Sequence, residues 1–293
     1  MALNVVGKAG LPALPIQRSV AELRRQVAEW RRAGETIGLV PTMGALHDGH
    51  LALAHRARRD CTRIIASLFV NPLQFNATDD FRLYPRDEAD DHRMLASAGV
   101  DLLFAPSVDE VYPPGFDTRV AVGALARPLC GATRPGHFQG VATVVTKLLL
   151  LTLPDYAFFG EKDYQQLLVI RRLALDLNFP VEIVGVPTVR EPDGLAMSSR
   201  NRHLSPAERE TASIIPRLLE NLADDIAGGG DIAEALISGR TALFEAGIDR
   251  VDYLECSDGA TLEPVRTLKP GARLLVACYV GKTRLIDNLK IPV

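Results

Sequence analysis

Two histidines stand three residues apart behind a predicted strand. The apolar run at residues 37–40 leads into the stretch PTMGALHDGH, which contains His47 and His50. The N-terminus of a helix attracts anions, and Gly44 and Gly49 allow the backbone to approach one closely. Imidazoles at such a place can hydrogen-bond phosphate oxygens and stabilise the charge of a transition state, and protonated rings would add charge as well. Zinc is disfavoured because no third ligand follows at motif spacing, and a turn capped by two histidines remains the alternative.

Amide side chains follow the next predicted strand. In the stretch FVNPLQFN, Asn71 and Gln74 offer hydrogen bonds without charge, which suits the hydroxyl or carboxylate groups of a small polar substrate. An Asn-Pro turn with a satisfied amide explains Asn71 equally well. Arg134 and His137 precede a strongly apolar helix in RPGHFQGVATVVTKLL. They are either exposed loop residues or further polar contacts at the same edge of the sheet.

Two further motifs suit the binding of phosphates. A buried strand delivers the stretch GEKD, in which Lys162 is a point charge for phosphate. Asp163 fits a helix N-cap with Gln166 as its capping-box partner, and a substrate contact from Gln166 competes with that role. In the later loop EPDGLAMSSRNRHLS, the hydroxyls and guanidinium at residues 198–200 can clamp a triphosphate as pyrophosphate leaves.

The acidic stretch YPRDEADD at residues 84–91 precedes a helical pattern. Carboxylates in the first turn of a helix are usually solvated and stabilise its N-terminus. The alternative is that Asp90 or Asp91 holds a Mg²⁺ ion that shares phosphate oxygens, since this ion needs only one or two carboxylates.

Predicted strands and helices alternate along the part of the chain that carries these residues. Apolar strands are predicted at 37–42, 63–70, 101–106, 156–160 and 181–187, with helices at 19–34, 50–60, 87–98, 139–152 and 163–177. This alternation predicts an α/β fold with a Rossmann-like, doubly wound parallel sheet. Ligands of such sheets bind beyond the carboxyl ends of the strands, where the polar residues fall. Residues 107–135 interrupt the pattern, with a possible antiparallel strand at 119–123.

The pattern changes after about residue 187. One helix is predicted from the capping box of Ser205 and Glu208 to three glycines at 228–230, and another at 231–246. Short strands follow at 251–258, 272–280 and 283–291. We therefore expect two domains, 1–187 and a smaller C-terminal α+β domain at 188–293.

Composition narrows the class of protein. The 293 residues are 47% hydrophobic and carry a net charge of −3, which argues against a broad nucleic-acid surface. The four cysteines are widely spaced, which is typical of free thiols in a reducing compartment. Prolines and glycines interrupt residues 1–15, and the longest apolar stretch contains Lys147 and is too short to span a bilayer. A cytoplasmic protein without a membrane anchor is expected.

The motifs also resemble known families. MGALHDGH resembles the HIGH-type signature of the nucleotidyltransferase superfamily, and MSSRN occupies the place of its KMSKS-type loop. The longer strings PTMGALHDGHL, FVNPLQFN, YPRD, PGHFQGVATVVTKLL, FGEKDYQQL and DGLAMSSRN resemble the pantothenate synthetase family in order and spacing. The resemblance implies an enzyme that condenses (R)-pantoate with β-alanine and ATP to give pantothenate, AMP and pyrophosphate through a pantoyl adenylate.

The same resemblance implies roles for individual residues. The implied ATP-binding residues are Met43, Gly44, Ala45, Leu46, His47, Asp48, Gly49, His50, Gly160, Glu161, Lys162, Asp163, Val189, Met197, Ser198, Ser199 and Arg200. The catalytic residues among these are His50, His47, Lys162 and Arg200; the resemblance implies His50 as proton donor, although phosphate stabilisation is physically clearer. Gln74 would contact pantoate and β-alanine, and Gln166 would contact pantoate. We add Asn71, Arg134 and His137 as substrate-binding residues from their positions alone.

The resemblance further implies Mg²⁺, for which Asp90 is the expected protein contact, and a cytoplasmic homodimer joined through the N-terminal domain. We expect the C-terminal domain to close as a lid that keeps water from the adenylate. Three alternatives stay open: a transferase that releases a nucleotide-linked product, an RNA-binding module related to synthetases, and a non-catalytic scaffold. The amides favour the ligase over the transferase, and the acidic pI of about 6.1 disfavours RNA.

Overall fold

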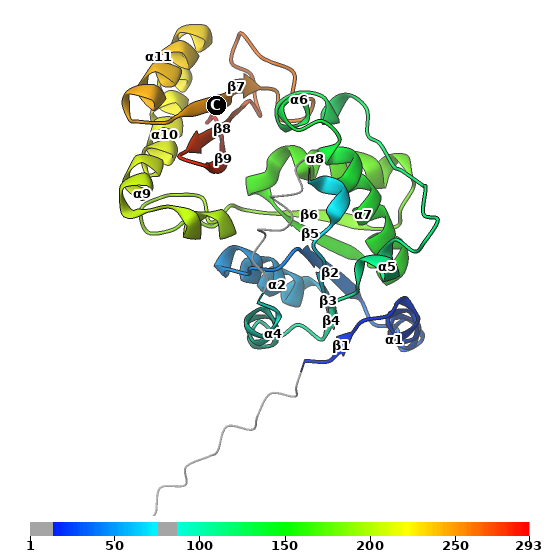
Figure 1. Cartoon of the computed structure of the whole chain (residues 1–293). Helices are drawn as coiled ribbons and strands as arrows, with labels where there is room; N and C mark the ends of the chain where they lie inside the picture. The colour runs from blue at the N-terminus through cyan, green and yellow to red at the C-terminus, as the bar shows by residue number, and fades with distance from the viewer. Residues whose placement is uncertain (1–13, 76–86, 293) are drawn as a thin grey trace, which may run out of the picture.

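The computed structural model describes residues 14–75 and 87–292. Residues 84–86 of the YPRD motif and most of the N-terminal stretch 1–15 therefore lie outside the described residues. The larger of the two sheets in the structure has six strands in the order β1-β4-β3-β2-β5-β6. Every pair of neighbouring strands is parallel (Figure 1). The strands are β1 (Ile16–Gln17), β2 (Ile37–Thr42), β3 (Arg63–Leu68), β4 (Leu102–Phe104), β5 (Tyr156–Gly160) and β6 (Glu182–Val186).

After β1, which lies at one edge beside β4, the chain enters the sheet at β2 and extends it in both directions. It passes through β3 to β4 on one side, then returns to β5 and β6 on the other. The topological switch point therefore lies between β2 and β5, and loops that follow these two strands lie on either side of a crevice. The expected Rossmann-like, doubly wound sheet is confirmed.

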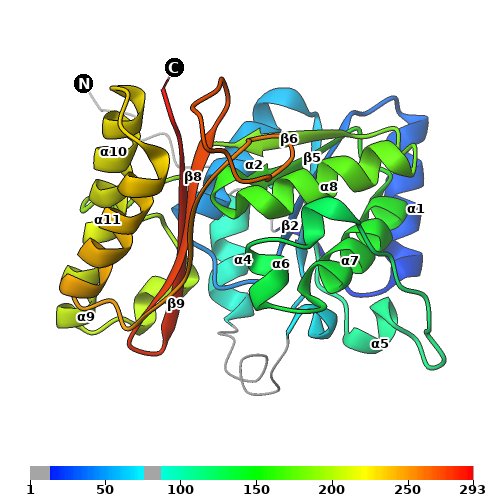
Figure 2. The same cartoon turned by 90° about the horizontal axis from the view of Figure 1, so that it is seen from above.

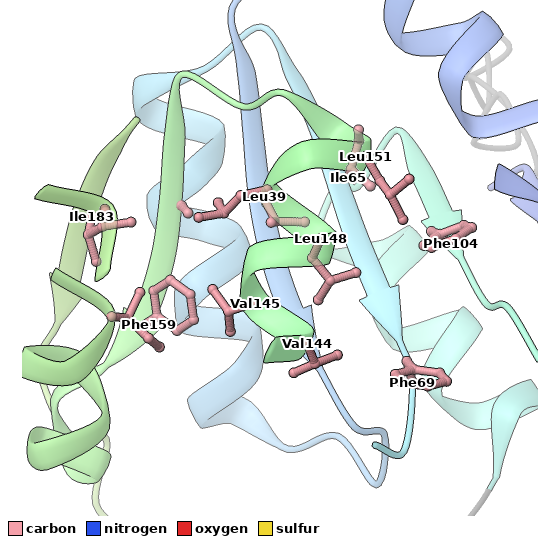
Figure 3. Packing of buried hydrophobic residues seen from close by; sticks show 14 of the residues in the cluster. Leu39, Ile65, Phe69, Phe104, Val144, Val145, Leu148, Leu151, Phe159 and Ile183 are labelled. Carbon is pink, nitrogen blue, oxygen red and sulfur yellow. The ribbon is translucent and has the colours of Figure 1, made fainter. Parts of the chain in front are cut away.

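Helices cover both faces of the parallel sheet. Alternate side chains of β2 belong to different apolar clusters. Leu39 packs with the helices at residues 20–32, 137–152 and 164–176, whereas Val40 packs with those at residues 48–60 and 88–97. Figure 3 shows the first cluster, in which Val145 and Leu148 of α7 lie over the strands. The helices of this part are α1 (Val20–Arg32), α2 (Asp48–Asp60), α4 (Glu88–Ser97), α5 (Val108–Val111), α6 (Cys130–Thr133), α7 (His137–Thr152) and α8 (Tyr164–Asp176), with 3₁₀ turns η1 (Pro72–Gln74), η2 (Ala124–Ala126) and η3 (Glu161–Asp163).

The expected strand at residues 119–123 does not form in the structure. The N–H of Val120 donates to the hydroxyl of Thr143 on α7 instead of to a neighbouring strand, at 3.0 Å. Val120 and Val122 pack against the apolar cluster around α7. The alternating apolar residues that suggested a strand therefore pack on a helix instead of pairing with another strand.

A second, three-stranded sheet follows. Its antiparallel strands β7 (Arg250–Ser257), β8 (Arg273–Val280) and β9 (Thr283–Lys290) pack on α10 (Ile214–Ala227) and α11 (Ile232–Glu245). The turn η4 (Ser199–His203) and helix α9 (Pro206–Ala212) precede them. The Ser205–Glu208 capping box is present, but the single helix expected here ends at residue 212 and α10 begins at 214. Pro216 has no N–H to continue the hydrogen-bond ladder, which explains the break.

The small sheet is buried on both faces. Leu274 and Val276 of β8 face α10 and α11, while Leu275 and Ala277 pack with Phe138 of α7 and with Leu168 and Val169 of α8. Figure 2 shows β8 and β9 standing between the two sets of helices. The small sheet is therefore docked on the part of the chain that carries the parallel sheet. Among the described residues, no helix has the length and apolarity needed to cross a bilayer.

Candidate active site

Two adjoining cavities open beyond the carboxyl ends of β2, β3, β5 and β6. The inner cavity has a volume of about 230 Å³ and is lined by residues that follow these strands. The outer cavity, of about 910 Å³, continues from it between α6–α8 and the small sheet. The two share Lys162, Asp163, Gln166, Ser198, Ser199 and Arg200. Together they have the size of sites that hold a nucleotide-sized ligand.

The two histidines lie side by side in the inner cavity. His47 is the N-cap of α2, its ring centroid is 4.1 Å from that of His50, and both line the cavity with Lys162. Loss of surrounding water and the charge of Lys162 lower the pKa of His47 to about 4. Desolvation, followed by His47 and Lys162, lowers the pKa of His50 to about 3. Both rings are therefore neutral at pH 7 and can donate one N–H each, without the extra charge that protonated rings would add.

A buried carboxylate supports the loop that leads to these histidines. Asp91 on α4 is 2% exposed and accepts hydrogen bonds from the N–H groups of Ala45 (3.0 Å) and Leu46 (2.8 Å). Gly44 has φ +90° and Ala45 has φ +52°, a conformation that this carboxylate stabilises. The expected ATP-binding residues Gly44, Ala45, Leu46 and Asp48 do not line the inner cavity, whereas Met43 and Gly49 do.

Asn71 and Gln74 are joined, and only one amide is available to a ligand. The Asn71 amide donates to Gln74 Oε1 (3.0 Å) and to Gly140 O, and accepts from Leu73 N–H and the Tyr112 hydroxyl. All of its hydrogen-bonding capacity is used, so it positions Gln74. Among the residues that the structure describes, the partner of Gln74 Nε2 is the weak acceptor Met43 Sδ, at 2.8 Å.

Arg134 and His137 contact the backbone of that same segment. His137 Nδ1 donates to Gln74 O at 2.9 Å, and Arg134 lies 3.1 Å from the other ring nitrogen. Both residues line the outer cavity. Burial, followed by the charge of Arg134, lowers the pKa of His137 to about 4.

The segment after β5 brings Lys162 to both cavities. The expected capping box between Asp163 and Gln166 does not form, because the turn η3 precedes α8 and neither side chain caps the helix. Both side chains instead line the inner and outer cavities. Glu161 does not line either cavity.

The Met197–Arg200 segment closes the inner cavity on the side of the small sheet. Met197 Sδ accepts from the N–H of Gly49 at 3.3 Å, so this segment touches the first turn of α2. Ser198 caps η4 through the N–H of Arg200. The segment is held by Asn201, which donates to Glu191 at 2.5 Å and to Ala196 O. The residues that line the inner cavity include Val189, Met197, Ser198, Ser199 and Arg200.

Asp90 does not lie with the other site residues. Its carboxylate pairs with Arg93 at 2.8 Å on α4 and lines neither cavity. Both oxygens of Asp91 are engaged by the loop. Within residues 14–75 and 87–292, no three His, Cys, Asp or Glu side chains group as a metal cage. Asp163 is the one carboxylate on the described wall of the inner cavity.

Several residues escaped prediction from the sequence. Asp91 holds the loop that leads to the histidines. The sequence contains nothing that distinguishes its role from that of the adjacent Asp90. Lys282 and Arg284 of the small sheet line the outer cavity, and Arg284 is paired with Asp252 at 2.8 Å. Nothing in their local sequence marks them, because the docking of the small sheet brings them there.

The fold and the site together define a doubly wound α/β protein in which two neutral histidines, Lys162, Arg200 and an amide side chain share one cleft at the switch point of the sheet. Residues 15–290 match the model of the pantoate-beta-alanine ligase family. The chain therefore belongs to this family, and it is a ligase.

Named relatives agree with this assignment. The pantothenate synthetase of Cereibacter sphaeroides is 54% identical over 277 residues, which are 94% of this chain and 99% of the relative. A pantothenate synthetase from Thermus thermophilus has a TM-score of 0.91 and 53% identity, covering 96% of this chain and all of the other. A pantoate-beta-alanine ligase from Francisella tularensis, complexed with beta-gamma ATP and beta-alanine, has a TM-score of 0.81 and 36% identity over 95% of this chain and 98% of the other.

Proposed function

We propose that this enzyme condenses (R)-pantoate with β-alanine, using ATP, to give pantothenate, AMP and pyrophosphate through a bound pantoyl adenylate. The observation that carries the proposal is the composition of the inner cavity. Neutral His47 and His50 at a helix N-terminus share it with Lys162, Arg200 and the Gln74 amide. The complex of the Francisella relative with beta-gamma ATP and beta-alanine supports ATP and β-alanine as substrates here.

In the first step the pantoate carboxylate attacks the α-phosphorus of ATP, and the bond to the bridging oxygen of pyrophosphate breaks. The N–H groups of His47 and His50 donate to oxygens of the pentacoordinate phosphorus. Lys162 and Arg200 neutralise the charge that moves onto pyrophosphate, and the hydroxyls of Ser198 and Ser199 donate to it.

In the second step the amine of β-alanine attacks the carbonyl carbon of the mixed anhydride. A C–N bond forms, the C–O bond to AMP breaks, and the amine loses one proton to solvent or a nearby base. Gln74 binds pantoate and β-alanine, and Gln166 binds pantoate. An amide side chain is a much poorer nucleophile than a carboxylate, so neither glutamine would attack the reactive adenylate. We propose residues 188–293 as a second domain that acts as a lid over residues 1–187 and keeps water from the adenylate.

Mg²⁺ fits this site as an ion that enters with ATP. Such an ion keeps several waters and needs only one or two protein carboxylates besides phosphate oxygens. Asp163 meets that need from the cavity wall, and Asp90 does not. When bound, the ion would neutralise charge on the phosphates.

Two further properties belong to the proposal. The four cysteines are free and buried, which supports a reducing cytoplasmic location. We also propose a homodimer that binds small molecules and no nucleic acid.

A quench-flow experiment tests this function. With ATP, Mg²⁺ and pantoate, we expect one equivalent of pyrophosphate per site before β-alanine is added, then AMP and pantothenate. Lys162→Ala should slow pyrophosphate formation by about 10²–10³-fold, the scale of one lost transition-state donor. The matched control Lys290→Ala alters an exposed lysine outside both cavities. A nucleotide-linked product without free AMP would instead indicate a transferase.

A further inference from the structure

The edge strand β9 presents three alternate side chains to the part of the chain that carries the parallel sheet. Arg284 contacts Cys130 and Thr133, Ile286 packs in the cluster with Phe138, and Asn288 reaches the turn after β5. Side chains two residues apart on a strand share a face, so one face of β9 makes all three contacts. Asn288 is the one that touches the backbone of a site residue.

The amide of Asn288 forms a clamp on two successive carbonyls. Its Nδ2 donates to Glu161 O at 3.0 Å and to Lys162 O at 2.9 Å, and the residue is 4% exposed. Arg273 donates to Asn288 Oδ1. Because a guanidinium can only donate, the amide oxygen must face Arg273, and its NH₂ group must face the carbonyls. The orientation of the clamp is therefore determined by its partners.

The turn that Asn288 clamps has little support of its own. η3 has three residues and no side-chain cap, and 3₁₀ turns have poor internal hydrogen-bond geometry. The direction of the Lys162 side chain follows from this backbone. A group that fixes both carbonyls thus fixes the origin of a side chain that must place its ammonium group within ångströms of a phosphate.

We propose that Asn288 is a positioning residue for the adenylation step, which it supports from the small sheet by fixing the backbone of Lys162. This rests on the proposed function, in which Lys162 binds the phosphates of ATP. Asn288 itself lines only the outer cavity. Its contribution is therefore made through Lys162, and a displacement of about 1 Å in a charged group can cost up to about 10²-fold in rate.

Single-turnover pyrophosphate formation tests the clamp. Asn288→Ala removes both donors and should slow formation by about 10- to 10²-fold at saturating ATP. Asn288→Asp keeps the shape but sets a carboxylate against two carbonyl oxygens, so it should be at least as slow. Tyr164→Phe is the matched control, because it deletes one hydrogen bond at the same interface, to Gly259 O at 2.8 Å, without touching η3 carbonyls. This control should keep a rate close to that of the unmodified enzyme.

A double-mutant cycle separates positioning from general loosening of the fold. If Asn288 acts through Lys162, the losses caused by Asn288→Ala and Lys162→Ala should not add, and the double variant should match Lys162→Ala alone. Additive losses, or an Asn288→Asp variant at the unmodified rate, would overturn the inference. Failure of the unmodified enzyme to form pyrophosphate from pantoate and ATP would instead refute the proposed function.

Discussion

The neutrality of His50 makes a sharp prediction about pH. At pH 7 the protonated ring is less stable than the neutral ring by about 5 kcal/mol, from a pKa of about 3 and about 1.4 kcal/mol per pKa unit. Fewer than about one molecule in 10³ of the ATP-free protein then carries imidazolium at this position. The neutral His50 ring can donate its N–H at every pH above about 5, whereas the protonated ring is scarce throughout that range.

We therefore expect the benefit of His50 to be independent of pH. His50→Ala should lower kcat/KM for ATP by about 10²–10³-fold, the scale of one lost donor. The ratio of unmodified enzyme to variant should stay constant between about pH 6 and 8.5, because kcat/KM reports protonation states of the free enzyme. ATP and the other residues titrate equally in both proteins and cancel from the ratio.

The assay is initial-rate pyrophosphate release at low ATP, with saturating pantoate, over that pH range. His55→Ala is the matched control, since His55 is an exposed residue on the same helix, and its ratio should be close to one. A ratio that falls tenfold per pH unit above about 6.5 would show that His50 works as an imidazolium. That result would refute the neutral-donor reasoning and support a proton donor.

Three further predictions follow from the surroundings of the site. Asp90→Asn should keep the turnover rate and its Mg²⁺ dependence within about twofold of the unmodified enzyme, because this carboxylate is exposed and pairs with Arg93. A clear rise in the Mg²⁺ concentration needed for turnover would show that Asp90 does contact the metal. Gly140→Ala should cost about 1–3 kcal/mol in urea unfolding and weaken β-alanine binding, because a Cβ would lie 2.2 Å from Leu73 O; an unchanged midpoint would contradict this. The free energy of unfolding should fall as pH drops from about 6.5 toward 4, by up to about 1.4 kcal/mol per pH unit for each of His47 and His50. The sign follows because their folded pKa values are lowered, so the unfolded state binds more protons in that window; denaturant melts at both ends should show it.

The sequence was most informative where a polar residue directly follows a strand. His47, Gln74 and Lys162 each come within a few residues of a buried strand, and parallel strands end at one edge. Local spacing therefore predicted that they meet, and it predicted the doubly wound sheet that makes them meet. The same local logic failed at residues 119–123, where an apolar alternation packs on a helix instead of pairing as a strand.

The supporting contacts were not predictable in this way. Asp90 and Asp91 are adjacent acids in the first turn of one helix, and only the rotation of α4 decides that Asp91 reaches the histidine loop while Asp90 meets Arg93. Asn71 presents the same difficulty. From the sequence, its amide could bind a substrate or form a turn equally well. In the structure, the hydroxyl of Tyr112, 41 residues away, donates the last of the hydrogen bonds that occupy this amide.

Both segments that we propose to bind phosphates depend on residues that lie far away in the chain. The loop before His47 is held by Asp91 from α4, and the turn at Lys162 is held by Asn288, 126 residues later on β9. The groups proposed to touch ATP can therefore be found from local sequence, but the precision with which they are held depends on distant partners. For the histidine loop this partner is Asp91 of α4, and for Lys162 it is Asn288, which the docking of the small sheet brings there. A change at the interface with the small sheet should thus lower the rate of adenylation before it lowers the affinity for pantoate, since the η1 segment, which carries the Gln74 amide proposed to bind substrate, is held independently by α7.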